Sequence, residues 1–304
     1  MHSSKTKLYP ISLFTYNRAE ETKKVIEALQ NNYLAAASDL YIFSDGPKKE
    51  TDIEKVQEVR AFIADIAGFN RVTVYNAKKN KGLANSIIQG VTRILENHEA
   101  TIVLEDDLVT SRNFLDFMNQ ALDFYKEDAS IFSVSGYTMN LPSLTKDKDF
   151  YFGIRASSWG WGVTKNVWQE VDWKVQSYSD FFNNREKQKQ FNKGGSDLTR
   201  MLKAQMDGKI DSWAVRFCYD QFKKNMITVF PTQSKLVSIG FSEDATHTSG
   251  VTRFNTPLDT SDKRNFSFKK YQQLDKVITK EFANKFSVYL RLKDFIRRKL
   301  SYVA

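Results

Sequence analysis

The stretch that most constrains the fold is ATIVLEDDLVTS, residues 100–111, in which an apolar run leads directly into Glu105, Asp106 and Asp107. A short continuous apolar run predicts a strand that is buried on both faces. The carboxylates then emerge at the carboxyl end of a central strand, where open α/β sheets bind ligands. Because adjacent carboxylates repel one another, the cluster predicts a Mg²⁺ or Mn²⁺ site that also contacts substrate phosphates. The alternative is an acidic cap on a helix that starts near Ser111.

Strands and helices alternate along most of the chain. This order predicts an α/β fold with a Rossmann-like, mostly parallel central sheet flanked by helices. The polar residues 183–195 are predicted to form a mobile loop or lid, and Ser196 is expected to cap the helix after it. Besides the strand before Glu105, we expect strands at 8–16, 39–44, 71–75, 131–135, 149–157 and 226–230, and helices at 19–31, 52–66, 83–96, 111–125, 196–206 and 212–224.

Composition limits the class of protein and its location. The 304 residues, 41% of them hydrophobic, are enough for a sizeable core. A net charge of +9 favours anionic partners, which include nucleotide-sugar phosphates, acidic lipid headgroups and nucleic acid. Cys218 is the single cysteine, the N-terminus is polar, and the apolar runs fall short of the ~20 residues that span a bilayer. We expect a cytoplasmic protein whose membrane contact is at most peripheral, on the inner face.

The last twenty residues, 285–304, predict a basic amphipathic helix. Such a helix can lie in an anionic membrane interface. The same pattern would suit a helix that packs on the protein or in a dimer, and both alternatives remain open. Its predicted apolar face consists of Phe286, Tyr289, Leu292, Phe295, Ile296 and Leu300.

Four short motifs follow the predicted strands in the order PISLFTYNR, YIFSDGP, NKGLANS and VLEDDL. This order resembles the nucleotide-sugar half of GT-A fold glycosyltransferases, of the family 2 kind and similar also to the N-acetylglucosaminyltransferase I type. The resemblance covers residues 8–108 and continues more loosely to about residue 250. It implies a GT-A domain at 1–255, divided into a nucleotide-sugar half (8–108) and an acceptor half (109–255), followed by a helical extension at 256–304.

The resemblance also implies roles for the acidic cluster. Asp107 would ligate the metal, Asp106 would face the ribose or the metal, and Glu105 would face the donor sugar. A divalent ion there stabilises the charge of the departing nucleoside diphosphate. His247, in SEDATHTSG, is a candidate further ligand, and a lone surface histidine is the alternative.

Nucleotide contacts are expected from the turns after the first three strands. The turn Thr15, Tyr16, Asn17 and Arg18 can wall the base and meet phosphate, and Asp45 can read the edge of the base. Lys81 and Asn85 can touch the nucleotide, while Gly82 allows close backbone approach at a helix N-terminus. The alternatives are a surface helix start at Arg18, a turn residue at Asp45, and a solvated basic turn at Lys81.

The sugars and the acceptor are expected to lie beyond the acidic cluster. Trp159 and Trp161, with Gly160 between them, can stack on a sugar face, or they are ordinary core tryptophans. An inverting transfer needs a carboxylate base, and Asp211, before Ser212-Trp213, is the best candidate. Its alternative role is the N-cap of the next helix. Glu170 and Asp172 are weaker candidates for the base.

We therefore expect an inverting, metal-dependent glycosyltransferase of hexosyl or N-acetylhexosaminyl type, using Mn²⁺ or Mg²⁺ and a nucleotide-sugar donor, with a UDP-sugar favoured. Its acceptor would be a glycan or a lipid-linked glycan in bacterial surface polysaccharide synthesis. One alternative is a sugar-phosphate nucleotidyltransferase, although the first strand lacks a glycine-rich, basic phosphate loop. Another is a non-enzymatic nucleic-acid-binding protein, but the chain has no recognisable nucleic-acid-binding motif, and no nucleic-acid partner is expected.

Overall fold

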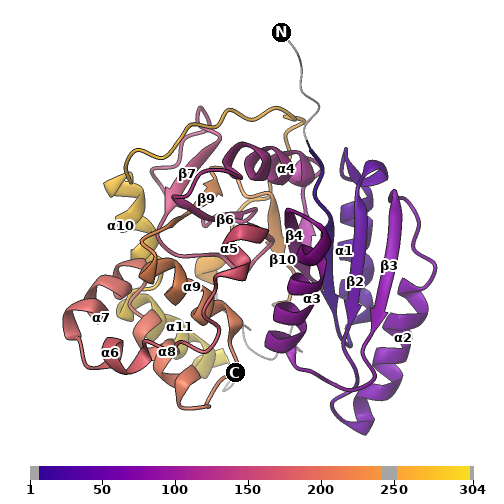
Figure 1. The fold of residues 1–304 in the computed structure, drawn as a ribbon, viewed down its shortest axis with the longest axis horizontal. Helices are drawn as coiled ribbons and strands as arrows, with labels where there is room; N and C mark the ends of the chain where they lie inside the picture. The colour runs from indigo at the N-terminus through magenta and orange to yellow at the C-terminus, as the bar shows by residue number, and fades with distance from the viewer. Residues whose placement is uncertain (1–6, 241–251, 302–304) are drawn as a thin grey trace.

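The computed structural model describes residues 7–240 and 252–301, with side chains up to Ile296 in the last helix (Figure 1). Its main sheet has the order β3-β2-β1-β4-β8-β6-β9-β7, and a small second sheet pairs β10 with β5. The strands are β1 (Ile11–Thr15), β2 (Asp39–Ser44), β3 (Arg71–Asn76), β4 (Ala100–Glu105), β5 (Leu108–Thr110), β6 (Ile131–Ser135), β7 (Phe150–Gly153), β8 (Trp161–Thr164), β9 (Ile227–Pro231) and β10 (Leu236–Ser238).

Most strands of the main sheet are parallel. β1 pairs in parallel with β2 and β4, β2 pairs in parallel with β3, and β6 pairs in parallel with β9. β8 is antiparallel to both β4 and β6, and β7 is antiparallel to β9. β6 and β9 therefore run in the same direction as β1 to β4, and only β7 and β8 run against them within this sheet. The predicted fold class, a mostly parallel central sheet flanked by helices, is confirmed.

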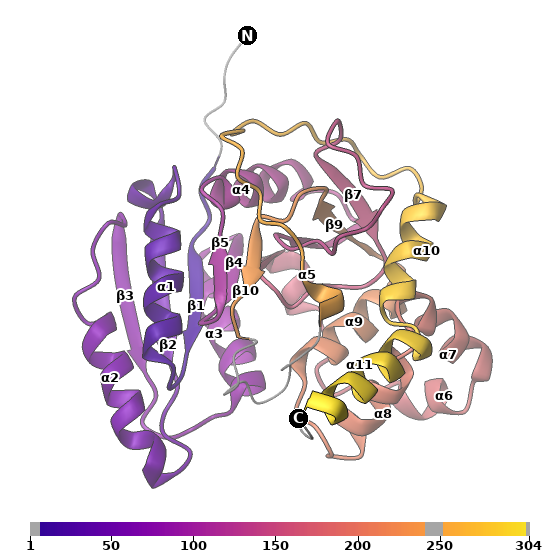
Figure 2. The ribbon, with the colours of Figure 1, turned by 180° about the vertical axis from the view of Figure 1, so that it is seen from behind.

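Helices cover both faces of the sheet, as the two opposite views show (Figures 1 and 2). α1 and α2 lie on one face of the N-terminal half, and α3 lies on the other, where it packs against α9. The helices are α1 (Ala19–Gln30), α2 (Ile53–Ile63), α3 (Leu83–Asn97), α4 (Phe114–Tyr125), α5 (Lys165–Gln169), α6 (Tyr178–Phe182), α7 (Arg185–Phe191), α8 (Leu198–Met206), α9 (Trp213–Lys223), α10 (Lys276–Lys285) and α11 (Val288–Ser301).

The central strands are apolar throughout because they contribute to two hydrophobic layers. Leu13 and Leu104 enter the layer beneath α1 and α4, whereas Phe14 and Val103 enter the layer shared with α3 and α9. Successive side chains of a strand point to opposite faces, so a strand covered on both faces needs an unbroken apolar run. This requirement fixes β4 in the middle of the sheet and places the acidic cluster at its carboxyl end.

Two predictions, for residues 183–195 and for Ser196, were wrong. Residues 183–195 form α7 and a 3-10 turn rather than a loop, because Phe191 is buried against Phe181 and anchors an otherwise polar helix. Ser196 does not cap α8. Its hydroxyl donates to the Phe286 carbonyl, and Asp197 occupies the N-cap position without a side-chain capping bond.

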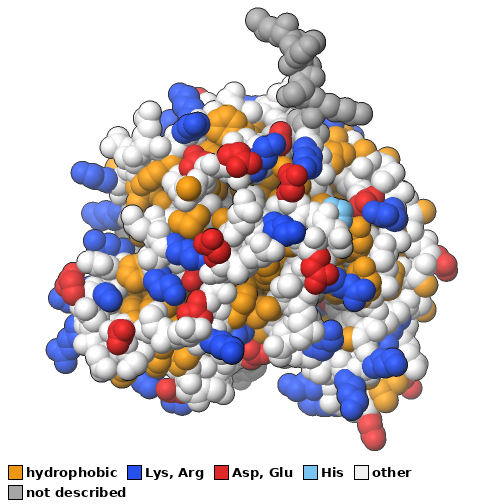
Figure 3. Space-filling model, viewed as in Figure 1, with side chains coloured by type: hydrophobic (Ala, Val, Ile, Leu, Met, Phe, Trp, Pro, Cys, Tyr) orange, Lys and Arg blue, Asp and Glu red, His pale blue; other side chains and the backbone are white. Residues whose placement is uncertain are grey.

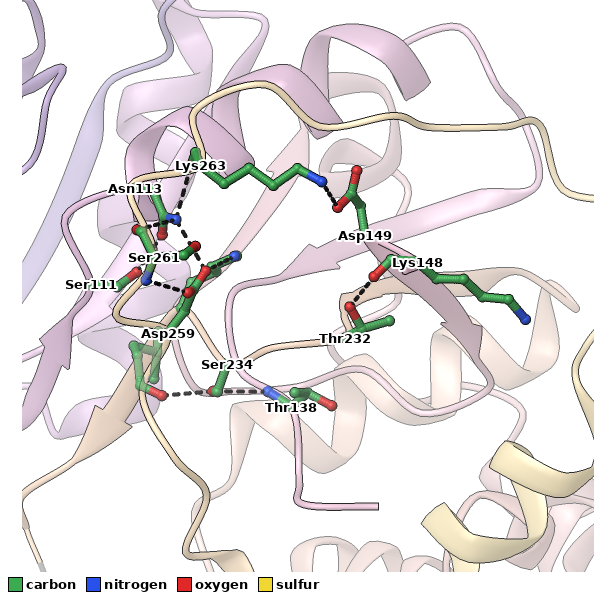
Figure 4. A network of polar contacts seen from close by, with 12 residues as sticks. Ser111, Asn113, Thr138, Lys148, Asp149, Thr232, Ser234, Asp259, Ser261 and Lys263 are labelled. Atoms are coloured by element: carbon green, nitrogen blue, oxygen red, sulfur yellow. Dashed lines mark hydrogen bonds and ion pairs between the residues drawn. The ribbon is translucent and has the colours of Figure 1, made fainter. Parts of the chain in front are cut away.

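The segment before α10 is tied into the core of the whole chain. Asp259 forms a buried ion pair with Lys235 and accepts a hydrogen bond of 3.0 Å from Asn113 Nδ2 (Figure 4). Lys263 pairs with Asp149 beside β7, in the same network (Figure 4). The same hydrophobic cluster that contains β1 and β4 also includes side chains from this segment and α10. Residues 256–286 therefore pack as part of the main body.

The predicted helix at 285–304 is shorter than expected, because α10 ends at Lys285 and α11 begins at Val288. Phe286, which was predicted to lie on the exposed apolar face, is instead buried against Phe282 and Phe254. Among the residues described, no helix combines the length and the apolar character needed to cross a bilayer.

Candidate active site

A cavity of about 810 Å³ opens where β1, β2 and β4 end at the same edge of the sheet. Parallel strands bring the residues that follow them to one edge, which is why motifs far apart in the sequence meet here. Of the predicted nucleotide-sugar contacts, the cavity wall contains Thr15, Tyr16, Asn17, Arg18, Asp45, Glu105 and Asp106.

Arg18 provides the positive charge beside the acidic cluster. Its guanidinium forms an ion pair with Asp106, and its Nη1 atom lies 3.3 Å from Asp107 Oδ2. Burial, reinforced by the two neighbouring aspartates, raises the pKa of Glu105 to about 8, and burial raises the pKa of Asp106 to about 6. The helix-cap alternative is excluded, because β5 separates the cluster from α4, whose N-cap is Asn113. The cluster thus holds more negative charge than one arginine offsets.

These carboxylates fit a divalent ion that is held partly by substrate. Within the described ranges, no group of three or more His, Cys, Asp and Glu side chains could hold a metal by itself. Mg²⁺ and similar hard ions commonly take one or two carboxylates and complete their coordination with water and phosphate oxygens. Asp107 would be such a ligand, with Asp106 beside it. His247, the other predicted ligand, lies outside the described residues.

Asp45 lies in the cavity wall and connects two of the loops that form it. Its carboxylate accepts hydrogen bonds from the backbone N–H groups of Gly46, Lys81 and Gly82, at 2.8 to 3.0 Å, and from Asn80 Nδ2 at 3.1 Å. Four donors fill the acceptor sites of a carboxylate. Asp45 therefore holds the turn after β2 against the loop before α3, which is the turn role rather than the base-reading role expected of it.

The first turn of the chain offers an unpaired polar atom to a ligand. The buried hydroxyl of Thr15 has no hydrogen-bond partner in the part of the chain that the structure describes. Tyr16 Oη and Asn17 Nδ2 instead donate to Asp52, at 2.8 and 3.2 Å. Asp52 lines the cavity and was missed by the sequence analysis, because it reads as an ordinary acidic residue at a helix start.

The predicted contacts from the third turn are peripheral. Lys81 Nζ donates to Gln89 of α3 at 2.9 Å, and Asn85 Nδ2 donates to the Lys81 carbonyl at 3.0 Å. Neither side chain lines the cavity of 810 Å³, although Gly82 does. Exposed lysines nevertheless gather at this end of the N-terminal half, where Figure 3 shows Lys and Arg side chains at the lower right. The loops that follow β2 and β3 contain the exposed residues Lys48, Lys49, Lys78, Lys79 and Lys81.

Trp161 is not a sugar-stacking residue, which corrects the prediction for one of the two tryptophans. It is 1% exposed and stacks on Trp213 with ring centroids 4.8 Å apart. β-strand alternation turns it into the core, so the alternative role applies. Gly160 is required by packing, because its φ is +52° and a Cβ atom there would overlap Leu236. Trp159 is partly exposed and lines a separate cavity of about 360 Å³.

Asp211 approaches Gly82, a residue of the first cavity's wall, from the C-terminal half. Its Oδ2 atom lies 3.7 Å from the position that a Cβ atom on Gly82 would take. Its side chain is 57% exposed, and its Oδ1 atom lies 3.4 Å from Arg216 Nη2. The N-cap of α9 is Ser212, whose hydroxyl accepts the Val215 N–H, so Asp211 does not have the capping role that was its alternative.

The two weaker base candidates lie at the far end of α9. Glu170 and Asp172 approach Lys224 and Lys223, in the last turn of the helix and beyond it. Asp172 also accepts the backbone N–H of Gln176 at 2.8 Å, as a turn residue does. A helix of this length separates its two ends by roughly 15 Å. Both carboxylates therefore lie at the end of α9 opposite to Asp211, away from the acidic cluster.

Known proteins resemble parts of this chain. The model of the Glycosyl transferase family 2 matches residues 11–195. The comparison with curated protein sequences gives no match. Among solved structures, the mannosyltransferase PcManGT from Pyrobaculum calidifontis, in complex with GDP-Man and Mn²⁺, is 10% identical with a TM-score of 0.38, covering 55% of this chain and 48% of that one.

S. aureus TarS is 13% identical with a TM-score of 0.37, covering 55% of this chain and 30% of that one. The chain thus spans less than half the length of either structure, and both scores are too low to transfer a residue or a ligand. The family match, in contrast, covers more than half of the chain and includes every motif from β1 to the acidic cluster. The chain belongs to glycosyl transferase family 2.

Proposed function

We propose that the enzyme is an inverting glycosyltransferase that depends on Mn²⁺ or Mg²⁺ and transfers a sugar to a hydroxyl of a glycan or lipid-linked glycan. The observation that carries this proposal is that Asp211 approaches the wall of the cavity that contains the acidic cluster. Glu105, Asp106 and Arg18 lie at the strand ends, and Asp211 lies beside Gly82, which lines the same cavity. An excess of carboxylates for a metal-bound diphosphate and a separate carboxylate for the acceptor are what this reaction requires.

Each group has a part in the reaction. Asp107 would hold the metal, and a bound divalent ion would supply positive charge beside the departing diphosphate. Arg18 adds a second positive charge beside the phosphates, and Thr15 offers its free hydroxyl to the nucleotide. Asp211 accepts the proton of the acceptor hydroxyl while that oxygen attacks the sugar carbon from the face opposite the leaving group. Arg216 orients the Asp211 carboxylate.

Within this proposal the donor is a UDP-sugar of the hexosyl or N-acetylhexosaminyl type, and the subtype resembles N-acetylglucosaminyltransferase I. The order of the four motifs supports this choice of subtype. The cluster of exposed lysines near the cavity supports an anionic donor of any base. The pathway we propose is the synthesis of a bacterial surface polysaccharide. The division into a domain at 1–255 and an extension from 256 stays a prediction about the chain's organisation, in which residues 256–286 of the extension pack on the domain.

We also propose that the enzyme contacts an anionic membrane through α11. Tyr289 is 71% exposed and Val288 64%, and Leu292, Phe295 and Ile296 are exposed beside them. The helix carries basic residues in its second half, and its acidic residue, Asp294, is buried in an ion pair with Arg253. An exposed apolar stripe with basic neighbours matches the interface of an anionic bilayer.

The test is a thermal-unfolding screen with UDP, GDP, TDP and CDP, each with and without Mn²⁺, and with a DNA oligonucleotide as a further arm. We expect one nucleotide to stabilise the protein only when the metal is present. Asp107→Asn should remove this stabilisation and lower turnover by about 10²-fold or more, because a metal ligand acts on the charge of the leaving group.

Stabilisation by a nucleotide that is equal with and without metal, together with wild-type turnover of Asp107→Asn, would show that the metal proposal is wrong. Stabilisation by DNA alone would contradict the proposed donor site.

A further inference from the structure

The cavity of about 360 Å³ in the C-terminal half has aromatic walls. Its volume falls within the range of about 300–1,000 Å³ that is typical of small-molecule sites. The wall is built from segments distant in sequence: residues 137–139 after β6, residues 155–159, helices α8 and α9, strand β9, residues 253–254, and α10 with the residue that follows it. Its rings belong to Tyr137, Trp159, Phe230, Phe254, Phe282 and Phe286.

The charges in this wall are compensated. Arg155 donates two hydrogen bonds to Asp197, at 2.7 and 3.0 Å, and Arg253 forms an ion pair with Asp294. Burial raises the pKa of the Cys218 thiol to about 11, so this group is neutral at physiological pH. A phosphate or carboxylate would therefore find no free positive charge among these groups. The cavity suits an uncharged ligand.

The wall also offers hydrogen-bond donors. Arg253 Nε is buried and has no hydrogen-bond partner among residues 7–240 and 252–296. Ser157 and Ser158 add hydroxyl groups to the same wall. An unpaired buried N–H group costs about 1–3 kcal/mol, which a ligand hydroxyl that accepts from it can offset. An acyl chain would fill the space but would leave this donor unpaired.

Helix α9 links this cavity to the first one. Asp211, which precedes the helix, lies beside Gly82 of the first cavity's wall, and Ala214, Val215 and Cys218 of the helix line the second cavity. Residues 211 and 214 are three positions apart, so their Cα atoms lie within roughly 11 Å of each other. On the opposite wall, Trp159 precedes Gly160, whose backbone packs against Leu104 at the end of β4. A ligand in the second cavity therefore lies close to the segment that carries the proposed base.

We infer that the second cavity binds an uncharged sugar ring of the acceptor glycan, and that α10 forms part of the wall of the acceptor site. This inference rests on the proposed function, because it assigns the acceptor to Asp211. Aromatic rings stack on the apolar C–H face of a pyranose, and the hydroxyls of the ring accept from Arg253 Nε and the serines. Phe282 and Phe286 extend the wall beyond the region that the family match covers, since that match ends at residue 195.

The same sugar can be presented by a free glycan or by a lipid-linked one. α11 follows α10 directly, so the wall of the cavity and the exposed apolar stripe belong to adjacent helices. A lipid-linked acceptor would place its sugar in the cavity while its lipid remains in the membrane that α11 contacts.

The experiment fills the cavity and measures sugar binding. Ala214→Phe adds a ring from α9, and Met201→Trp adds one independently from α8, since both residues line the wall. Ala61→Phe is the matched control, because Ala61 is exposed on α2 and lies in neither cavity. The probes are the methyl glycosides of glucose, galactose, mannose and N-acetylglucosamine, observed by saturation-transfer NMR with UDP and Mn²⁺ present.

We expect at least one glycoside to bind the wild type and Ala61→Phe, and to bind at least tenfold more weakly to Ala214→Phe and Met201→Trp. UDP and Mn²⁺ should raise the unfolding temperature of all four proteins equally, which shows that the filled variants are folded and that the donor site is intact. Octyl glycosides in phosphatidylglycerol vesicles form the second arm. If the octyl glycoside in vesicles binds more tightly than the free methyl glycoside, the acceptor is lipid-linked. If the two bind equally, the acceptor is a free glycan.

Glycoside binding that is unchanged in both filled variants overturns the inference, as does the absence of any glycoside signal from a wild type that binds UDP. A wild type that binds no nucleoside diphosphate with metal would instead contradict the proposed function, so the two failures are separable.

Discussion

The two cavities of this protein are built in opposite ways. The first lies at the ends of parallel strands, is lined by turns that each follow a strand, and concentrates carboxylates around one arginine. The second lies among helices from distant parts of the chain, is lined by rings, and has its arginines paired with aspartates. The carboxylates of the first cavity are only partly neutralised, whereas each arginine of the second cavity is paired with an aspartate.

This difference matches two tasks of a sugar transfer. Charge develops on the departing diphosphate, so the first cavity gains from ionic groups that are poorly neutralised before the donor arrives. The acceptor remains neutral until its hydroxyl loses a proton, so shape and stacking suffice to hold it. The comparison suggests that the two cavities can be damaged separately, and the following predictions are ordered from the largest expected effect.

The largest effect is expected at Asp211, between the cavities. Asp211→Asn keeps the shape of the side chain but removes its basicity, so kcat should fall by about 10²–10⁴-fold while metal-dependent nucleotide binding stays near wild type. Single-turnover transfer and calorimetry with the nucleotide measure the two quantities.

Ser212→Ala is the control for Asp211. It removes the N-cap of α9 and should lower the free energy of unfolding by about 1 kcal/mol, with kcat almost unchanged. An Asp211→Asn enzyme with normal kcat would mean that another group accepts the proton.

The next effect concerns the segment that supports the aromatic cavity. Lys235→Met should reduce the free energy of unfolding by about 3–5 kcal/mol, because it leaves Asp259 buried without its cation. Lys235→Met/Asp259→Asn should recover much of the loss, since the amide is uncharged. Urea unfolding measures both variants. If the double variant were no more stable than the single one, the ion pair would not be the cause.

A smaller effect is expected from Gly240→Ala in the charged cavity. A Cβ atom there would overlap Asp107 Oδ2 and lie 3.2 Å from Arg18 Nη1. The displaced carboxylate should weaken metal-dependent UDP binding by about tenfold, equivalent to about 1.4 kcal/mol, without changing glycoside binding. Calorimetry with UDP at several Mn²⁺ concentrations tests this. Unchanged metal dependence would indicate that Asp107 adjusts or is not a ligand.

The smallest effect on the fold is expected at the surface of α11. Leu292→Ser and Phe295→Ser should release the protein from phosphatidylglycerol vesicles and change the free energy of unfolding by about 0.5 kcal/mol or less, because both side chains are exposed. Vesicle binding by the wild type should weaken as salt rises. Partition equal to that of the wild type would contradict the membrane contact, whereas weaker glycoside binding would couple α11 to the second cavity.

The sequence predicted the charged cavity better than the aromatic one. Asp106, Asp107 and Arg18 follow strands whose apolar runs are unmistakable, and a parallel sheet then brings them together. The second cavity depends on contacts between Phe286 and the segment around Arg155, more than a hundred residues apart. No local pattern encodes a contact of that kind, so only the folded chain reveals it.

Some site predictions were wrong because the same residue type can serve either a binding site or the packing of the fold. Trp161 was predicted as a sugar platform because glycines flank it, yet strand alternation directs it into the core. Asp45 has a carboxylate that could read the edge of a base, but its oxygens accept hydrogen bonds from backbone N–H groups of the loop before α3. In both cases the role depends on which atoms of distant segments contact the side chain. The spacing of residues along the sequence does not reveal these contacts.

The late segment at 256–286 has a consequence for how the chain matures during synthesis. Its side chains complete the hydrophobic layer beneath α1 and α4, and Asp259 completes an ion pair with Lys235. On the ribosome, translation proceeds at about 5–20 residues per second, so the earlier strands wait for several seconds with that layer open. During this interval the nascent chain exposes apolar surface, and a premature stop before residue 256 would leave that surface open and the product prone to aggregation.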